Sequence, residues 1–298
     1  MRYMKHPALC AALLFCLAAA PGAALAGQTI TINSTISSGS VYGNGSQPDG
    51  SGSAGDPNNN TVIIGSSGVV NDSITGGYSL AAPSISGNRV EISGTTNKNI
   101  FGGSAGANSG DVTVNNNHIV INPGATINYT STYSTAGYYN RSTTHTVSIR
   151  DNRITINGGN VKTPFAGGYA VLHSSSGTAL VTNNTVTVNG GTITSPFSGG
   201  MSYAGSGTGE ANGNNVIITG GTVNASVDGG SITSSAGMGK AINNVITVSG
   251  TPDLQNASLY GGYSSDSSHD VFSGNTLNID TDTLSVKVVR NFEFLNFY

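Results

Sequence analysis

The stretch Gly102-Gly103-Ser104-Ala105-Gly106 has the spacing that places a nucleophilic serine between two glycines. In enzymes that use this spacing, the serine lies on a sharp strand-to-helix turn and works with a histidine and an aspartate. No helical periodicity flanks the stretch, and the same glycine pair returns at several other places in the chain. We therefore interpret the match as part of a repeat and predict no catalytic serine.

Acidic side chains are the next candidates for chemistry, because enzymes that cleave polysaccharides use paired carboxylates or a calcium ion held by carboxylates. The carboxylates of this chain are scattered, and no two occupy the same place in neighbouring repeats: Asp72, Glu91, Asp111, Asp151, Glu210, Asp228 and Asp253. Asp280 and Asp282 are the closest pair, which we interpret as a solvated end of the fold. The sequence therefore predicts no catalytic residue, and a polysaccharide lyase or hydrolase remains the alternative.

Metal and cofactor sites have no clear signature. The histidines after the N-terminal region stand at unrelated positions: His118, His145, His173 and His269. The glycine pairs lack the following aspartate of a calcium-binding nonapeptide repeat. We predict no metal and no cofactor.

Four tyrosines stand close to a glycine pair: Tyr78, Tyr169, Tyr203 and Tyr263. Such rings either pack at a corner of the fold, which we favour, or form an exposed column on which sugars or partner surfaces stack.

Residues 1–26 have the features of a secretory signal peptide. Arg2 and Lys5 precede an apolar run, and Ala24-Leu25-Ala26 offers small residues for cleavage. We expect the mature chain to begin at Gly27. Both cysteines, Cys10 and Cys16, fall within the signal, so no disulfide is expected after cleavage. The sequence therefore predicts export.

Composition excludes some partners. Without Arg2 and Lys5, nine basic side chains face 14 acidic ones, a net charge of −5, and only 8% of the 298 residues are charged. No basic patch is present, so we predict no nucleic-acid binding. No later segment has the length of apolar residues that a membrane helix needs, so we predict no transmembrane segment.

Eight asparagines each open a short run of alternating residues, at intervals of 28, 29, 35, 32, 30, 30 and 31 residues. A Val, Ile or Leu follows each of them at two and at four positions, which is typical of a strand with one buried face. A ninth, weaker copy begins at Gln28. The asparagines are Asn60, Asn88, Asn117, Asn152, Asn184, Asn214, Asn244 and Asn275.

Strands this short cannot bury an apolar face within one repeat, but they can when the repeats stack. The sequence therefore predicts an all-β fold, a right-handed parallel β-helix of about nine coils with roughly 30 residues and three strands in each. The asparagines share the parity of the buried positions, so we expect their amides to form an inward-facing structural ladder.

Glycine pairs recur once or twice in each copy. Glycine tolerates positive φ and close approach of a neighbouring backbone, so we expect the pairs at the corners of the coils. The predicted corner glycines are Gly102, Gly103, Gly167, Gly168, Gly199, Gly200, Gly229 and Gly230.

The stretches NNTVTVNGG…SPFSGG, NNVIITGGTV…VDGGS and NNVITVSG…LYGGY resemble the β-helical passenger domains of bacterial autotransporters, the type V secretion family. The resemblance extends over residues 27–290 and implies export to the surface of a Gram-negative bacterium. A translocator barrel follows such passengers, and the chain lacks one. We therefore expect residues 291–298, rich in Phe and Tyr, to be a truncated C-terminal segment.

The function expected from these features is structural or adhesive and not enzymatic. The protein would be displayed at the cell surface, held at the outer membrane or released, with specificity in its variable loops. Its ligand would be a protein or glycan of a host or bacterial surface. We also expect end-to-end self-association, because terminal coils expose unpaired backbone.

Overall fold

The computed structural model describes residues 27–45, 55–107, 109–129, 131–141, 143–173, 176–234, 239–264 and 270–298. The predicted signal peptide, residues 1–26, and His269 lie outside these ranges. Throughout the described part of the chain, regular structure consists of parallel strands without any helix, and none of it could span a membrane as a helix.

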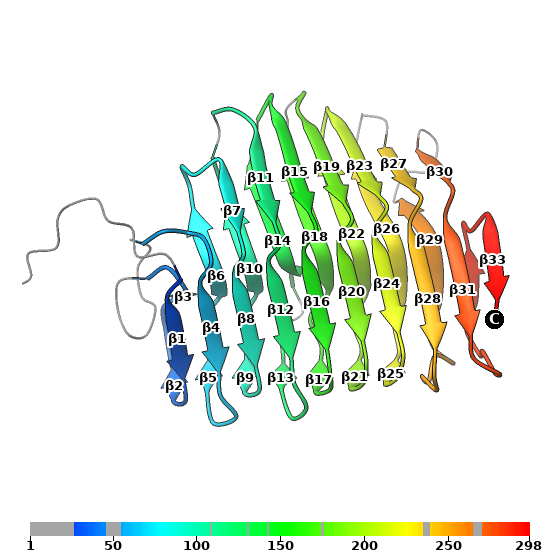
Figure 1. Cartoon of the computed structure of the whole chain (residues 1–298), viewed down its shortest axis with the longest axis horizontal. Helices are drawn as coiled ribbons and strands as arrows, with labels where there is room; N and C mark the ends of the chain where they lie inside the picture. The colour runs from blue at the N-terminus through cyan, green and yellow to red at the C-terminus, as the bar shows by residue number, and fades with distance from the viewer. Residues whose placement is uncertain are drawn as a thin grey trace, which may run out of the picture.

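The strands stack into a β-solenoid whose coils follow one another along the axis, from blue to red in Figure 1. The predicted fold class is therefore confirmed. The solenoid has about eight turns of about 31 residues, slightly fewer than the nine coils expected. Four parallel sheets, which we name A to D, run along it.

Sheet A carries the strands that open each repeat. In order, its strands are β1 (Thr29–Ile32), β4 (Thr61–Ile64), β8 (Arg89–Ile92), β12 (His118–Ile121), β16 (Arg153–Ile156), β20 (Thr185–Val188), β24 (Asn215–Ile218), β28 (Val245–Ser249), β31 (Thr276–Asp280) and β33 (Phe294–Phe297). Sheet B has two-residue strands: β2 (Thr35–Ile36), β5 (Val69–Val70), β9 (Thr95–Thr96), β13 (Thr126–Ile127), β17 (Asn160–Val161), β21 (Thr192–Ile193) and β25 (Thr222–Val223).

Sheet C contains the longest strands, and sheet D closes the coil. Sheet C consists of β3 (Val41–Tyr42), β6 (Ile74–Ser79), β10 (Ile100–Ala105), β14 (Ser134–Arg141), β18 (Phe165–Leu172), β22 (Phe197–Ala204), β26 (Ser226–Ser234), β29 (Ser258–Ser264) and β32 (Val288–Arg290). Sheet D consists of β7 (Ser84–Ser86), β11 (Val112–Asn115), β15 (Thr146–Arg150), β19 (Thr178–Thr182), β23 (Thr208–Asn212), β27 (Gly239–Ile242) and β30 (Val271–Ser273).

A complete coil therefore has four strands, not the three expected. The sequence suggested a variable loop between the second glycine pair and the next asparagine. In that interval the chain extends the sheet C strand, turns, and adds the sheet D strand before the next coil begins, as β18, β19 and β20 illustrate. The strand was missed because its alternating residues include alanine and glycine, which carry little β-propensity.

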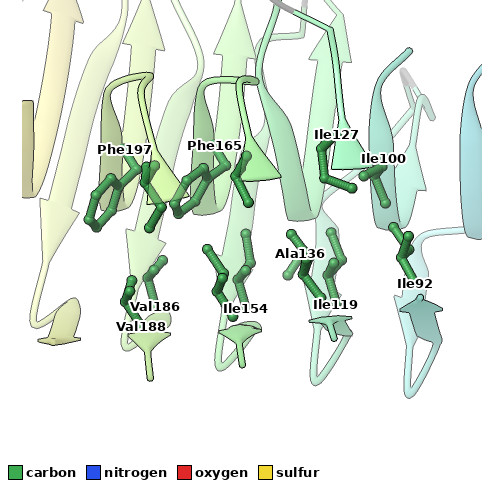
Figure 2. Packing of buried hydrophobic residues seen from close by; sticks show 14 of the residues in the cluster. Ile92, Ile100, Ile119, Ile127, Ala136, Ile154, Phe165, Val186, Val188 and Phe197 are labelled. Carbon is green, nitrogen blue, oxygen red and sulfur yellow. The ribbon is translucent and has the colours of Figure 1, made fainter. Parts of the chain in front are cut away.

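Two apolar cores run along the solenoid, and the smaller of them is divided into two separate clusters. The larger one lies between sheets A and B and the first half of sheet C, where neighbouring coils repeat the same inward positions (Figure 2). Phe165 and Phe197, for example, stack in adjacent coils with ring centroids 4.6 Å apart. The smaller core lies between sheet D and the second half of sheet C, and includes Val147, Val181 and Leu172.

The corner between sheets D and A requires a residue with positive φ in every coil. The residue directly before each of the eight asparagines has φ between 55° and 71°: Asn59, Gly87, Asn116, Asp151, Asn183, Gly213, Asn243 and Gly274. Asn, Asp and Gly are the residue types that tolerate this region. The corner after sheet A uses the first glycine pair in the same way, with Gly159, Gly191 and Gly221 at φ 84° to 91°.

The glycines predicted to be corners occupy a different place. Gly102, Gly103, Gly167, Gly168, Gly199, Gly200, Gly229 and Gly230 lie inside strands of sheet C, and their φ values are not in the left-handed region. The prediction that they turn the chain was wrong. None of them has room for a Cβ, which is the second reason for glycine, close approach. A Cβ on the second glycine of a pair would meet the amide of a ladder asparagine, and a Cβ on the first would lie 2.3–2.6 Å from a backbone carbonyl oxygen of the next coil.

At the C-terminal end, β33 pairs with β31 and places Leu295 next to Leu277 of the core column. Leu295, Phe294 and Phe297 are 53%, 54% and 73% exposed. This face of the terminal coil is therefore apolar, and self-association through it stays a prediction.

Candidate functional site

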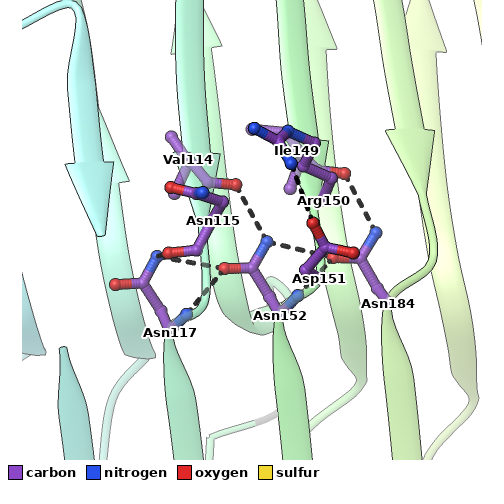
Figure 3. Close-up of polar contacts among 8 residues, drawn as sticks. All are labelled: Val114, Asn115, Asn117, Ile149, Arg150, Asp151, Asn152 and Asn184. Atoms are coloured by element: carbon purple, nitrogen blue, oxygen red, sulfur yellow. Dashed lines mark hydrogen bonds and ion pairs between the residues drawn. The ribbon is translucent and has the colours of Figure 1, made fainter. Parts of the chain in front are cut away.

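The eight asparagines form a continuous ladder along the solenoid. Figure 3 shows the part of it that contains Asn117, Asn152 and Asn184. In the step shown there, Asn184 Oδ1 accepts hydrogen bonds from both the backbone N–H and the Nδ2 of Asn152, each 3.0 Å long. Asn152 Nδ2 also donates to the carbonyl of Val114 in sheet D at 3.0 Å. The remaining steps repeat the bond from backbone N–H to Oδ1.

Every asparagine of this ladder is at most 1% exposed, and it stands where the two cores meet. A buried amide is costly unless its donors and acceptor are satisfied, and stacking copies of one residue satisfies them repeatedly. The ladder is therefore a polar seam that fixes the register of the coils, and its amides are engaged in the fold.

The second glycine pair forms the wall beside this seam. A Cβ on Gly200 would lie 2.5–2.6 Å from the amide atoms of Asn214, and one on Gly168 would lie 2.8 Å from those of Asn184. Asparagine and glycine are thus complementary parts of one contact, which answers why the pair repeats in step with the asparagine.

The residue after each glycine pair faces outward, because its neighbours on both sides along the strand face the interior. The register of sheet C aligns these residues in one line, which we call the outer column: Tyr78, Ser104, Tyr138, Tyr169, Met201, Ser231 and Tyr263. Tyr78, Tyr169 and Tyr263 therefore lie at the middle of strands and not at corners. Corner packing, the interpretation favoured from the sequence, was wrong for them.

A cleft of about 640 Å³ opens where β10 interrupts this column. Strand β10 and the residue that follows it present Ser104 and Gly106, whereas β6 and β14 on either side present Tyr78 and Tyr138. The missing side chains leave a trough over β10. We call it the β10 cleft; its lining is Tyr78, Leu80, Ser104, Ala105, Gly106, Tyr138, Asn140, Arg141 and His173.

Both tyrosine walls are held by further rings. Tyr42 lies behind Tyr78 with the centroids 5.2 Å apart, and Phe101 stacks on Tyr138 at 4.6 Å. Tyr169 of the next coil lies 5.9 Å from Tyr138. With adjacent strands spaced at roughly 4.8 Å, the two strands that carry the walls are about 10 Å apart. The cleft is therefore a preformed slot on a rigid sheet.

Polar groups gather at the loop end of the cleft. Asn140 Nδ2 donates to the Tyr138 hydroxyl at 2.8 Å, and its Oδ1 accepts from His173 Nε2 at 2.5 Å. Arg141 hydrogen-bonds to Tyr78. Burial raises the pKa of Tyr138, and burial together with Tyr42 raises the pKa of Tyr78 despite the opposing effect of Arg141. Both hydroxyls therefore stay protonated at neutral pH.

Ser104, the serine of the nucleophile-like spacing, is part of this floor and not of a turn. Strand β10 continues through Ala105, and the hydroxyl has no histidine and aspartate arranged as its partners in the lining of the cleft. The strand geometry agrees with interpreting GGSAG as part of the repeat.

The histidines and carboxylates named from the sequence are spread over several sheets, although His118 and Glu91 lie on adjacent strands of sheet A. His118 and Glu91 belong to the outer face of sheet A, Glu210 pairs with Lys240 on sheet D at 2.7 Å, and Asp228 belongs to sheet C. Within the residues that the structure describes, no three His, Cys, Asp or Glu side chains are grouped closely enough to hold a metal ion.

His118 is part of a hydrogen-bonded network on sheet A. Its Nδ1 lies 3.1 Å from Arg89 Nη1 and its Nε2 lies 3.0 Å from Thr155 Oγ1. Burial, with Arg89 and Arg153 nearby, lowers the pKa of His118 to about 4. The ring is therefore neutral, so Nδ1 accepts from the guanidinium and Nε2 donates to the hydroxyl.

Asp228 is an acidic group enclosed on the outer side of sheet C. It is only 8% exposed, and its Oδ1 accepts from Ser226 Oγ at 2.9 Å. Burial raises its pKa to about 7, and the bond from Ser226 opposes that rise in part. No sequence signal marked this aspartate, because its burial depends on neighbouring coils.

The β10 cleft could have been predicted from the sequence if the repeats had been aligned on their glycine pairs. Reading one position past each pair places Ser104 between Tyr78 and Tyr138, as GGYSL, GGSAG and AGYYN show. The polar residues Arg141 and His173 lie three positions after Tyr138 and four positions after Tyr169, and they carry no repeat signal. Comparisons of the chain with protein-family models, curated proteins and solved structures find no match, so function is argued from this geometry.

Proposed function

We propose that the protein is an exported, non-enzymatic β-solenoid with a structural or adhesive role, displayed at or released from a Gram-negative cell surface. The β10 cleft is its contact with a glycan or protein ligand. The observation that carries this proposal is the preformed slot between Tyr78 and Tyr138 on the outer face of sheet C. Tyrosine is enriched at binding surfaces because one ring offers apolar area and a polar hydroxyl together.

The position of the cleft supports an adhesive role. Arg141 is the last residue of β14 and His173 directly follows β18, where the chain leaves sheet C for sheet D. Loops on a rigid scaffold commonly carry specificity. The asparagine ladder supplies the rigid scaffold, so the loops can vary without loosening the walls of the cleft.

The distribution of carboxylates favours binding over hydrolysis. Glycoside hydrolysis uses two carboxyl groups on either side of the scissile bond. The lining of the β10 cleft contains tyrosine hydroxyls, an amide, an imidazole and a guanidinium, and no carboxylate. The cleft can therefore hold a polar ligand but lacks the acid and base for that reaction.

An adhesion assay tests the proposal. Wild-type protein would be immobilised, and bacterial and epithelial cells retained on it would be counted against an albumin surface. Ser104→Tyr fills the cleft with the side chain that neighbouring coils carry at the same place, and we expect retention to fall to the albumin level. Ser231→Tyr is the matched control, in the same column but four coils further along.

Equal retention by wild-type protein and albumin would overturn the adhesive role. Retention that Ser104→Tyr leaves unchanged would overturn the assignment of the cleft. In both cases the melting midpoints of the two variants would establish that they are folded.

A further inference from the structure

We propose that the ligand of the β10 cleft is a carboxylate-bearing sugar within an acidic polysaccharide. This inference rests on the proposed function and names the chemistry of the same site. The sugar ring lies between Tyr78 and Tyr138, above Ser104, and its carboxylate faces Arg141 at the loop end.

The shape of the cleft selects a flat ring. The gap is one strand wide, because only β10 presents small side chains there, while the strands on both sides present tyrosines. Its volume of about 640 Å³ is within the roughly 300–1,000 Å³ typical of small-molecule sites. The C–H face of a pyranose ring can pack on the ring of Tyr78, and its hydroxyls can meet the tyrosine hydroxyls at the rim. Phe101 of β10 stacks on Tyr138, so this second wall offers its edge and its hydroxyl.

Gly106 determines how closely the Arg141 side chain can approach the sheet. A Cβ on Gly106 would lie 2.7 Å from Leu80 Cδ2 and 3.3 Å from Arg141 Nε, so the two side chains close over this glycine from opposite sides. Any larger residue would separate them. Gly106 therefore lets the guanidinium lie low over the sheet, within reach of a group in the trough.

The charges select an anionic sugar. Arg141 and His173 are the groups in the lining that can carry positive charge, and none of its nine residues is acidic. The chain as a whole has more acidic than basic residues, so a cleft lined in this way departs from the average of the surface. Arginine offers paired N–H donors that match the geometry of a carboxylate.

Two observations argue against a nucleic acid or an extended peptide as the ligand. A nucleic acid would need a row of cations along its phosphates, whereas the lining holds a single guanidinium. An extended peptide would bind by adding to a sheet edge, whereas β10 is paired on both sides, by β6 and β14.

The test is isothermal titration of the full chain with two acidic oligosaccharides, from hyaluronan and from polygalacturonate. Each is compared with its methyl-ester form, which keeps every hydroxyl and removes the charge. We expect at least one acidic oligosaccharide to bind, and its methyl ester to bind about tenfold more weakly or not at all. Arg141→Gln should weaken binding of the acid to the level of the ester and leave the ester unchanged.

The cleft variants locate the binding. Ser104→Tyr should abolish heat release with the acidic oligosaccharide, and Ser231→Tyr should leave the affinity within about twofold of wild type. Equal affinity for acid and ester, or an Arg141→Gln variant with the wild-type affinity, would overturn the inference. So would binding that survives Ser104→Tyr, because the sugar would then occupy another surface.

The outcomes separate this inference from the proposed function. If cells are retained by wild-type protein and lost with Ser104→Tyr, while neither acidic oligosaccharide binds, the inference fails and the adhesive role stands. If neither retention nor sugar binding is detected, both fail.

Discussion

The inside and the outside of sheet C obey different rules. Facing inward, the second residue of the glycine pair is glycine in every coil from β6 to β29: Gly77, Gly103, Gly137, Gly168, Gly200, Gly230 and Gly262. A ladder asparagine packs against each of the first six, whereas Phe272 and Ala241 pack against Gly262. One residue further along the same strands, the outer column changes among Tyr, Ser and Met. Two adjacent positions therefore differ completely in how far they can vary.

The difference has a physical origin. An inward residue is enclosed by the equivalent residues of the coils before and after it. A substituted side chain must therefore pack against both neighbouring coils. An outward residue meets its copies on the sides only and has solvent beyond. Repetition therefore marks what holds the solenoid together, and departure from repetition, as at Ser104, marks what is free to acquire a ligand.

The largest effect expected from this comparison is the loss of a ladder asparagine. Asn214→Ala removes the bonds from Asn214 Nδ2 to Val181 O and Asn244 Oδ1, and leaves the Asn184 backbone N–H without its acceptor. Each buried polar group left without a partner costs about 1–3 kcal/mol. We expect a loss of about 3–5 kcal/mol in the free energy of unfolding, measured by denaturant titration.

Asn189→Ala is the matched control on the outside. Asn189 Nδ2 also donates to an asparagine of the neighbouring coil, Asn157, at 3.0 Å, but this pair is exposed. Water can replace the bond, so the change should be within about 0.5 kcal/mol. Similar losses in the free energy of unfolding for the two variants would contradict the distinction between the buried asparagine ladder and the exposed pair of Asn157 and Asn189.

Asp228 sharpens the comparison, because it lies on the outer side of sheet C and is nevertheless buried. Its folded pKa of about 7 is above the usual value of 3.8, so its contribution to stability is present below pH 3.8 and is lost as the pH rises through 7. Asp228→Asn cannot ionise. We expect the variant to be more stable than wild type at pH 8, by a few kcal/mol at most.

The same advantage should shrink as the pH falls below 7, because the folded wild-type carboxyl is then protonated and no charge is buried. Thermal melts of both proteins at intervals from pH 4 to pH 8 measure the difference. An advantage that is independent of pH would mean that the ionisation of Asp228 does not oppose folding.

The sequence predicted the class of fold, its period and the identity of the ladder, because the asparagine and the two apolar residues after it are constrained in every coil. It did not predict which glycines turn the chain. Gly191, in the first pair, and Gly200, in the second, look alike in sequence, yet one has φ 91° and the other lies within a strand. A need for positive φ and a lack of space for Cβ select the same residue.

The candidate site could not be predicted from the sequence of any single repeat. Whether a cleft forms depends on the size of side chains in three successive coils, and these coils are separated by 26 and 34 residues at the outer column, from Tyr78 to Ser104 and on to Tyr138. Tyr78 was named from the sequence and Tyr138 was not. The outward direction of Tyr78 could not be predicted, because the assumed corners changed the parity of the strand.

Gly191→Ala should have a smaller effect, and it tests which glycine of the first pair turns the chain. Its φ of 91° and a Cβ placed 2.7 Å from Gly159 O should cost about 1–3 kcal/mol. Gly190→Ala is the control, because its φ is not in the left-handed region and its Cβ would lie 3.0 Å from Asn157 O. We expect a smaller loss of melting midpoint for Gly190→Ala, and the reverse order would contradict the assignment of the corner.

The contact between glycine and asparagine is the central claim, and a double-mutant cycle on Gly200 and Asn214 tests it most directly. Gly200→Ala alone should destabilise by about 1–3 kcal/mol, because its Cβ meets the Asn214 amide. Asn214→Ala removes those amide atoms and makes room for that Cβ. The double variant should therefore be more stable than the sum of the single losses predicts, by at least about 1 kcal/mol in the free energy of unfolding. Additive losses would contradict the claim that glycine is repeated to accommodate the ladder.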